Sequence, residues 1–107
     1  GGLTKARITR DLAELWNIPC VVMSSVELSI STLASMHLAA TLKELPFACE
    51  ASGPYEIEDI ADNGWRISNG KFIVPNGPGF GLEVNEDKLR YYTEHTWVCD
   101  EHSQVLD

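Results

Sequence analysis

The chain opens with an alternation of amphipathic and fully apolar segments. From Thr4 to Trp16, apolar side chains recur at helical spacing between charged ones, which predicts an amphipathic helix with one buried side, ended by Asn17. The segment Ile18 to Met23 is short, rich in β-branched residues and apolar at both odd and even positions. Because a strand covered on both faces has this pattern, we expect a buried parallel strand here.

The same pattern of a helix followed by a strand then repeats. Ser29 or Ser31 can cap a second helix that continues to Leu42 without a charged residue, so we expect it to be buried on most sides. A second apolar run follows. We predict that Ile18 to Ser24 and Pro46 to Cys49 are adjacent parallel strands, joined by a right-handed crossover through this helix.

The character of the sequence changes after Gly53-Pro54, where β-forming residues replace the helical pattern. Two short β-rich stretches, Trp65 to Ser68 and Lys71 to Pro75, flank the dipeptide Asn69-Gly70. Since this dipeptide is typical of two-residue hairpin turns, the stretches predict a β-hairpin.

The last third of the chain holds a glycine-rich loop, one short helix and a polar tail. The loop, residues 76–81, fits neither the Walker pattern nor the dinucleotide fingerprint, which disfavours phosphate binding. Asn85 can cap a helix from Glu86 to Tyr92. The remainder, Thr93 to Asp107, is polar and acidic without periodicity, and we expect it to be disordered.

Composition limits the function classes that remain. With 107 residues, of which 44% are hydrophobic, the chain has material for one core, and therefore for one domain or part of one. Its 8 basic and 16 acidic residues give a net charge of −8, which repels phosphate backbones and anionic lipid headgroups. We therefore expect no nucleic-acid partner and no membrane partner.

The cysteines argue against a disulfide framework or a zinc site. Cys20, Cys49 and Cys99 lie far apart and form no Cys-x-x-Cys pair. Cys20 and Cys49 each lie in an apolar run, where a thiol usually behaves as a small buried hydrophobic group. Free thiols and the lack of an apolar signal segment favour a cytoplasmic location.

Polar residues follow both predicted strands. Ser24, Ser25 and Glu27 come after the first strand, and Glu50 ends the second. In parallel α/β folds the chemistry gathers at the carboxyl ends of the strands, where these carboxylates could act as general bases, orient a substrate hydroxyl or ammonium, or bind metal. The alternative for Glu27 is a structural role, in which its carboxylate caps the following helix and interacts with the helix dipole.

One histidine lies on the second predicted helix. His37 falls about two turns past the strand end, on an apolar helix. A packed, hydrogen-bonded histidine is the better interpretation than a catalytic base.

Several short motifs, taken in their order and spacing, resemble one known family. They are Gly1 to Ala6, Ile18-Pro19, Ser24 to Glu27, Ile30 to Thr32, Ala34, His37 to Ala40, Gly53-Pro54 and Pro78 to Leu82. Together they resemble the carboxyl-terminal part of the enolase superfamily, within the mandelate racemase and muconate lactonizing enzyme family. The resemblance covers Gly1 to about Tyr92.

The resemblance implies an α/β fold, the carboxyl-terminal portion of a (β/α) barrel with a β-rich segment of the capping domain. Ile18 to Ser24 would be barrel strand seven, and Pro46 to Glu50 would be strand eight, with helices flanking both. The implied domains are a partial barrel over residues 1–62, a return segment of the capping domain over 63–92, and a disordered tail over 93–107.

The resemblance also implies a cofactor that this chain cannot hold. Family members use a divalent metal, usually magnesium, to stabilise the enolate formed when a proton is removed next to a carboxylate. Their acidic metal ligands lie on strands three to five, and the lysine acid/base residues of the muconate branch lie on strands two and six. A barrel needs about 250 residues. The chain therefore resembles a fragment or the product of a truncated gene, and it should be inactive alone.

Three positions favour the muconate-like branch. Mandelate racemase-like members place a catalytic histidine at the end of strand seven, where this sequence has Ser25. In the muconate-like branch a glutamate near the substrate matches Glu27, and a carboxylate at the end of strand eight matches Glu50. The resemblance thus implies Ser24, Ser25, Glu27 and Glu50 as substrate-binding residues, and no catalytic residue or metal ligand in this chain.

Two functions follow as hypotheses. The first is a piece of a metal-dependent cycloisomerase, racemase, epimerase or dehydratase that acts on a small carboxylate substrate. The second is a self-standing, non-catalytic α/β domain that serves in association, including association with its own copies, since unpaired barrel strands expose edges and apolar faces.

Overall fold

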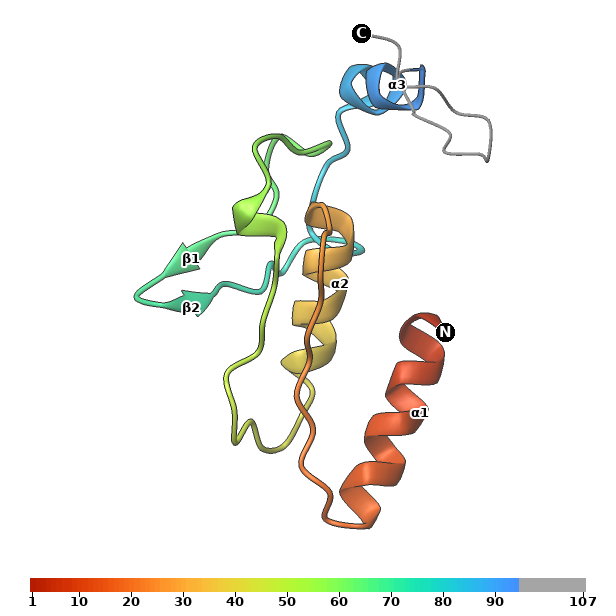
Figure 1. The fold of residues 1–107 in the computed structure, drawn as a ribbon, viewed down its shortest axis with the longest axis vertical. Helices are drawn as coiled ribbons and strands as arrows, with labels where there is room; N and C mark the ends of the chain where they lie inside the picture. Colours follow the sequence, from red (N-terminus) through yellow and green to blue (C-terminus); the bar gives the residue numbers. More distant parts are fainter. Residues whose placement is uncertain (95–107) are drawn as a thin grey trace, which may run out of the picture.

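The computed structural model describes residues 1–94, in which helices dominate and a small hairpin projects to one side (Figure 1). Figure 1 shows α2 at the centre, with the hairpin on one side and α1 on the other, where α1 and α2 are in contact. The elements in chain order are α1 (Gly2–Leu15), α2 (Ser29–Ala39), the 3-10 helix η1 (Gly53–Tyr55), β1 (Ile67–Ser68), β2 (Lys71–Phe72) and α3 (Glu86–Glu94).

The first predicted helix is confirmed as α1, but its predicted buried side is not. Asn17 ends the helix in a left-handed conformation with φ 53°. The amide of Ile18 donates to the carbonyl of Ala13 at 2.8 Å, and the amide of Asn17 donates to Glu14 at 3.1 Å, which together form a Schellman motif. No residue of α1 is buried, because the described chain offers no element that covers its apolar stripe.

The two predicted strands are extended segments rather than strands. Residues 18–24 and 46–49 both run from the lower end of the molecule in Figure 1 toward the amino end of α2, so they are parallel. One backbone hydrogen bond joins them, from the amide of Glu50 to the carbonyl of Val22 at 3.1 Å. The prediction of a paired sheet is therefore wrong here. A two-stranded pair is marginal without further strands beside it.

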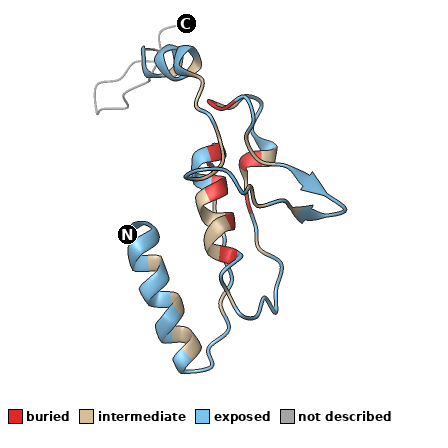
Figure 2. Ribbon diagram, turned by 180° about the vertical axis from the view of Figure 1, so that it is seen from behind, coloured by how far each residue is buried: buried red, intermediate tan, exposed pale blue. Residues whose placement is uncertain are grey.

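Helix α2 supplies most of the core, but it begins and ends differently from the prediction. Leu28 is the N-cap residue, so neither Ser29 nor Ser31 caps the helix, and the helix ends at Ala39 rather than Leu42. Figure 2 shows the buried positions gathered along α2 and the segment beside it. The buried residues of α2 are Ser29, Thr32, Leu33, Met36 and Ala39, joined elsewhere by Ala51, Ile60 and Ala61.

The predicted hairpin is confirmed. Strands β1 and β2 pair in antiparallel register, with Ile67 opposite Phe72 and Ser68 opposite Lys71. Asn69 and Gly70 form the turn, with φ of 51° and 72°. Positive φ at both central residues is the signature of a type I′ turn, which is why this dipeptide was informative.

The predicted cap of the last helix is also confirmed. The side-chain oxygen of Asn85 accepts a hydrogen bond from the amide of Lys88 at 3.0 Å, which satisfies a free amide of the first turn of α3. The helix extends to Glu94, two residues past the predicted end, so Thr93 belongs to α3 rather than to a disordered tail. The rest of the predicted tail, residues 95–107, lies outside the described residues.

Two further observations concern the cysteines and membrane insertion. Cys20 and Cys49 are free and half-exposed, so the prediction of buried thiols is wrong, because the extended segments that carry them are uncovered on one side. Within residues 1–94, none of the helices has the length and apolarity needed to cross a bilayer.

Candidate functional site

Two of the predicted site residues are in direct contact. Ser24 ends the first extended segment, and its hydroxyl donates a hydrogen bond to the Oε1 atom of Glu27. Glu27 is only 8% exposed. A carboxylate at this depth needs hydrogen-bond partners, and Ser24 supplies one.

The turn between these two residues has an unusual backbone. Val26 adopts φ 53°, in the left-handed region that β-branched residues rarely enter, and its side chain is 83% exposed. An exposed valine gains nothing from burial at this place. The left-handed residue folds the chain back, so that Glu27 returns toward Ser24 instead of continuing along the extended segment. Backbone conformations of this kind cluster at functional sites.

Of the alternative role of Glu27, the capping hydrogen bond does not occur among the contacts of residues 1–94, while its interaction with the helix dipole stays a prediction. Helix α2 has no side-chain cap from its own N-cap residue, Leu28. Its first amide, that of Ser29, is bonded by another carboxylate, that of Asp59, at 3.2 and 3.1 Å. The hydrogen bond of Glu27 goes to Ser24 instead.

Glu50 lies beside the first extended segment. Its backbone amide donates to the carbonyl of Val22, two residues before Ser24. The residue is exposed, as is Ser25. The structure therefore brings Ser24 and Glu27 into contact and places the backbone of Glu50 close to the same end, while Ser25 and Glu50 face solvent.

Sequence reasoning missed Asp59. Its carboxylate accepts hydrogen bonds from the amide and the hydroxyl of Ser29, which lies 30 residues earlier in the chain, and from the amide of Ala61 at 3.3 Å. Aspartate is a common capping residue, but caps are recognised from adjacent positions. No local pattern connects Asp59 to α2.

His37 behaves as the sequence predicted. Its Nε2 atom lies 3.3 Å from the carbonyl oxygen of Phe80, and the two rings are 5.9 Å apart. The side chain is half-buried. This histidine therefore fastens the glycine-rich loop to α2.

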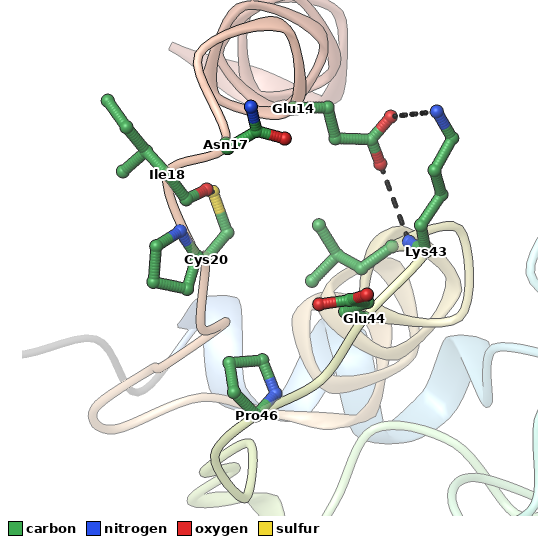
Figure 3. Close-up of a pocket in the computed structure, with 9 residues that line it drawn as sticks. Glu14, Asn17, Ile18, Cys20, Lys43, Glu44 and Pro46 are labelled. Atoms are coloured by element: carbon green, nitrogen blue, oxygen red, sulfur yellow. Dashed lines mark hydrogen bonds and ion pairs between the residues drawn. The ribbon is translucent and has the colours of Figure 1, made fainter.

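A cavity of about 390 Å³ lies at the opposite end of the extended segments (Figure 3). Figure 3 shows Lys43 bridging to Glu14 across its rim, and the ion pair measures 3.4 Å. Its lining comes from the stretches where the two extended segments begin, namely residues 17–20, 42–44 and 46, together with Glu14. In parallel α/β folds this end is associated with stability rather than with catalysis, so we place the candidate site at the Ser24 end.

Two residues that lie away from the candidate site, Asp62 and Tyr92, have shifted pKa values. Hydrogen bonds from the Asn85 side chain and from Lys88 hold the pKa of Asp62 below its ordinary value. The hydrogen bond that the Tyr92 hydroxyl donates to Glu58 raises the pKa of Tyr92. Both groups anchor α3. Among residues 1–94, no cluster of three or more histidine, cysteine or acidic side chains could hold a metal ion.

Comparison with known proteins gives a consistent result. Residues 1–88 match the family described as enolase C-terminal domain-like. The chain is 33% identical over 94 residues to a chloromuconate cycloisomerase of Pseudomonas putida, and the match covers 87% of this chain and 25% of that protein. The chain thus spans about a quarter of the length of this relative.

Solved structures agree with the sequence match. The crystal structure of an enolase from Mycobacterium smegmatis complexed with formate and acetate superposes with a TM-score of 0.79 at 32% identity, over 89% of this chain and 23% of that one. The crystal structure of an enolase from Gibberella zeae complexed with magnesium, formate and sulfate superposes with a TM-score of 0.78 at 30% identity. This match covers 89% of this chain and 23% of that one.

The matched residues include both extended segments, α2, the hairpin and the start of α3, so the resemblance seen in short motifs holds over nearly all of the described chain. The chain therefore belongs to the enolase superfamily, in the muconate-like branch of its mandelate racemase and muconate lactonizing enzyme family.

Proposed function

We propose that this chain is the carboxyl-terminal part of a metal-dependent enzyme that removes a proton next to the carboxylate of a small substrate. The reaction would be that of a cycloisomerase, racemase, epimerase or dehydratase, carried out in the cytoplasm. Support comes from the family match and from the chloromuconate cycloisomerase relative. About three quarters of that relative has no counterpart here, so activity requires a further part of the protein.

One observation carries the proposal, an uncovered apolar surface that we call the apolar seam. On α1, Ile8, Leu12 and Leu15 follow the i, i+4, i+7 spacing of one helix face, and all are exposed. Along the first extended segment, exposed Val21 and Met23 alternate with less exposed neighbours, as on one face of a strand, whereas the second segment is exposed throughout residues 45–48. The residues of the apolar seam are Ile8, Leu12, Leu15, Trp16, Val21, Met23, Leu45 and Phe47.

The apolar seam includes some of the most exposed large apolar side chains of residues 1–94. Trp16 is 77% exposed and Leu15 is 78% exposed. Where large apolar side chains gather on an exposed surface, another protein surface commonly packs against them.

The candidate site would line the substrate in the assembled enzyme. Ser24, Ser25, Glu27 and Glu50 belong to the turns and ends that follow the extended segments. Glu27 is held by Ser24 and is nearly buried, so its carboxylate is suited to orienting a substrate hydroxyl. Ser25 and Glu50 are exposed and free to meet a ligand.

The described residues do not fit a magnesium site. Magnesium prefers several oxygen ligands in near-octahedral geometry. Glu27 already accepts a hydrogen bond from Ser24, and no acidic cluster of three occurs in residues 1–94. We assign the metal ligands to the part of the enzyme that this chain does not match, and we derive no step of the reaction through the ion.

Complementation tests the proposal. The chain would be mixed with the three quarters of the Pseudomonas putida relative that it does not match. We expect a one-to-one complex by sedimentation and a blue shift of tryptophan emission as Trp16 becomes covered. The proposal would be contradicted if the chain is a monomer that unfolds cooperatively and does not bind the complementary part.

A matched pair of variants locates the interface. Leu12→Glu places a charge in the apolar seam and should weaken the complex at least tenfold, since burying an unpaired charge is costly. Ile67→Glu is the control, because Ile67 is 48% exposed and Leu12 is 54% exposed. Ile67 belongs to β1, which lies on the other side of α2 from α1 (Figure 1). This control should bind as the unmodified chain does.

The second candidate function is that of a non-catalytic association domain. The same apolar seam favours it, because a second copy could cover that surface. In that case the chain alone should form a defined dimer, Leu12→Glu should dissociate it, and the complementary part should not compete.

A further inference from the structure

The start of α2 is fixed from a distant part of the chain. The first amides of a helix have no acceptor inside it, and Leu28 has no side chain that could serve. The Asp59 carboxylate takes this role, accepting from the amide of Ser29 through both of its oxygens and from the Ser29 hydroxyl through Oδ2. Ser29 is fully buried, at 0% exposed. With Asp59 in place, Ser29 is therefore closed to solvent.

Asp59 is itself held in place. The amide of Ala61 donates to its Oδ1 atom. Ala61 forms an antiparallel bridge with Val84, and the carbonyl of Ile60 accepts from the amide of Asn85 at 2.8 Å. Ile60 and Ala61 are buried. The segment after η1 is therefore anchored before it meets α2.

Glu27 stands immediately before this anchored helix end. The carbonyl of Leu28 accepts the first helical hydrogen bonds, from the amides of Ser31 and Thr32 at 3.0 and 3.1 Å. Glu27 is the residue before Leu28, and the left-handed Val26 precedes it. The direction in which Glu27 leaves the backbone thus depends on where α2 begins.

We propose that Asp59 is a positioning residue for Glu27. By holding Ser29, it fixes the first turn of α2 and with it the turn that presses Glu27 against Ser24. Its effect on turnover rests on the function proposed above, whereas its effect on the geometry of Glu27 does not.

Nuclear magnetic resonance on the full chain tests the geometric part. In Asp59→Ala, hydrogen exchange of the Ser29 amide should rise about tenfold, the usual scale for a lost cap. The carboxyl carbon of Glu27 and the Cβ of Ser24 should shift together toward the values of solvated side chains. Asp59→Asn keeps one acceptor oxygen and should give an intermediate result.

The control for this experiment is Asp62→Ala, which removes a nearby carboxylate that bonds Asn85 and Lys88 instead of α2. It should leave the Glu27 and Ser24 resonances in place. If Asp59→Ala unfolds the chain, Ser29→Ala removes the hydroxyl bond alone and should still shift Glu27. Faster Ser29 exchange with unmoved Glu27 and Ser24 resonances would overturn the proposal.

A double-mutant cycle in the assembled enzyme tests the consequence for turnover. If Asp59 acts through Glu27, then Asp59→Ala should lower kcat by about tenfold with little change in KM, and should add almost nothing to Glu27→Gln. If the losses of kcat in the two single variants multiply in the double variant, the two residues act independently and the positioning role is overturned. An unchanged kcat in Glu27→Gln would instead reject the proposed site, while the resonance result would stand on its own.

Discussion

Gly64 lies so close to Ser29 that a methyl group on Gly64 would overlap the Ser29 hydroxyl. The serine is fully buried in the first turn of α2. The segment after η1 can therefore approach the helix only because both residues are small. This contact holds the segment that carries Asp59 against α2.

Gly64→Ala should lower the free energy of unfolding by about 1–3 kcal/mol, the usual range for overpacking a filled site. Thermal or urea unfolding measures it. Adding Ser29→Ala should restore only part of the loss, since the Cβ of residue 29 would still lie 2.9 Å from the new methyl group. An unchanged free energy of unfolding in Gly64→Ala would contradict the close contact between Gly64 and Ser29.

Val26→Asn should stabilise the chain by about 0.5–1 kcal/mol, because asparagine tolerates the left-handed region better than valine does. The exposed valine side chain has little packing to lose. Val21→Asn serves as the control, since Val21 is not left-handed, and it should give no gain. Equal melting temperatures for Val26→Asn and the unmodified chain would argue against strain at this turn.

If Glu27 lies next to the substrate, as proposed, Glu27→Gln in the assembled enzyme should lower turnover by about 10²-fold while changing stability little, because it keeps the shape and removes the charge. Steady-state kinetics and a thermal melt on the same variant measure the two effects. Glu44→Gln alters a carboxylate at the opposite end of the extended segments and should leave turnover unchanged. A lowered melting temperature with normal turnover would show that Glu27 is structural.

The contribution of Asp62 to stability should fade in acid. Its pKa lies below the ordinary value of 3.8, first because of the Asn85 hydrogen bond and then because of Lys88. A lowered folded-state pKa means that the contribution is fully present above the unfolded pKa and is lost as pH falls through the folded value, hence below about pH 3.8.

Titration of the Asp62 carboxyl carbon by nuclear magnetic resonance checks this expectation. Asn85→Ser keeps a good cap for α3 but removes the amide donor, so it should raise the pKa of Asp62 toward its ordinary value. Lys88→Met removes both a hydrogen bond and a nearby positive charge, so it should also raise the pKa of Asp62. An unchanged pKa of Asp62 in either variant would contradict the causes assigned to its shift.

The chain alone should bind magnesium only weakly, because carboxylates without a full set of ligands leave the ion largely hydrated. Calorimetric titration measures this. The assembled complex is the positive control and should bind stoichiometrically. A micromolar site on the isolated chain would contradict the proposal that the metal ligands lie in another part of the enzyme.

Local signals allowed the correct prediction of several elements. The end of α1 at Asn17, the hairpin turn at Asn69-Gly70 and the cap of α3 at Asn85 each depend on residues adjacent in sequence. The pairing of the two parallel segments could not be predicted in the same way, because pairing depends on contacts between residues far apart in the sequence, and within residues 1–94 these segments share one backbone hydrogen bond. In the candidate site, Ser24 and Glu27 could be named from the sequence, and the structure places them in contact. Asp59 could not, because its hydrogen bonds reach Ser29, 30 residues earlier, and no local pattern marks that contact.

The lack of any buried residue in α1 has a consequence for proteolysis. A helix held mainly by polar contacts at one end, such as Arg10 to Thr41 and Lys43 to Glu14, can open locally without unfolding α2. Lys5, Arg7 and Arg10 make α1 a substrate for trypsin, and cleavage there follows local opening rather than global unfolding. The rate of tryptic cleavage in α1 is thus an intrinsic reporter of whether its apolar face is covered.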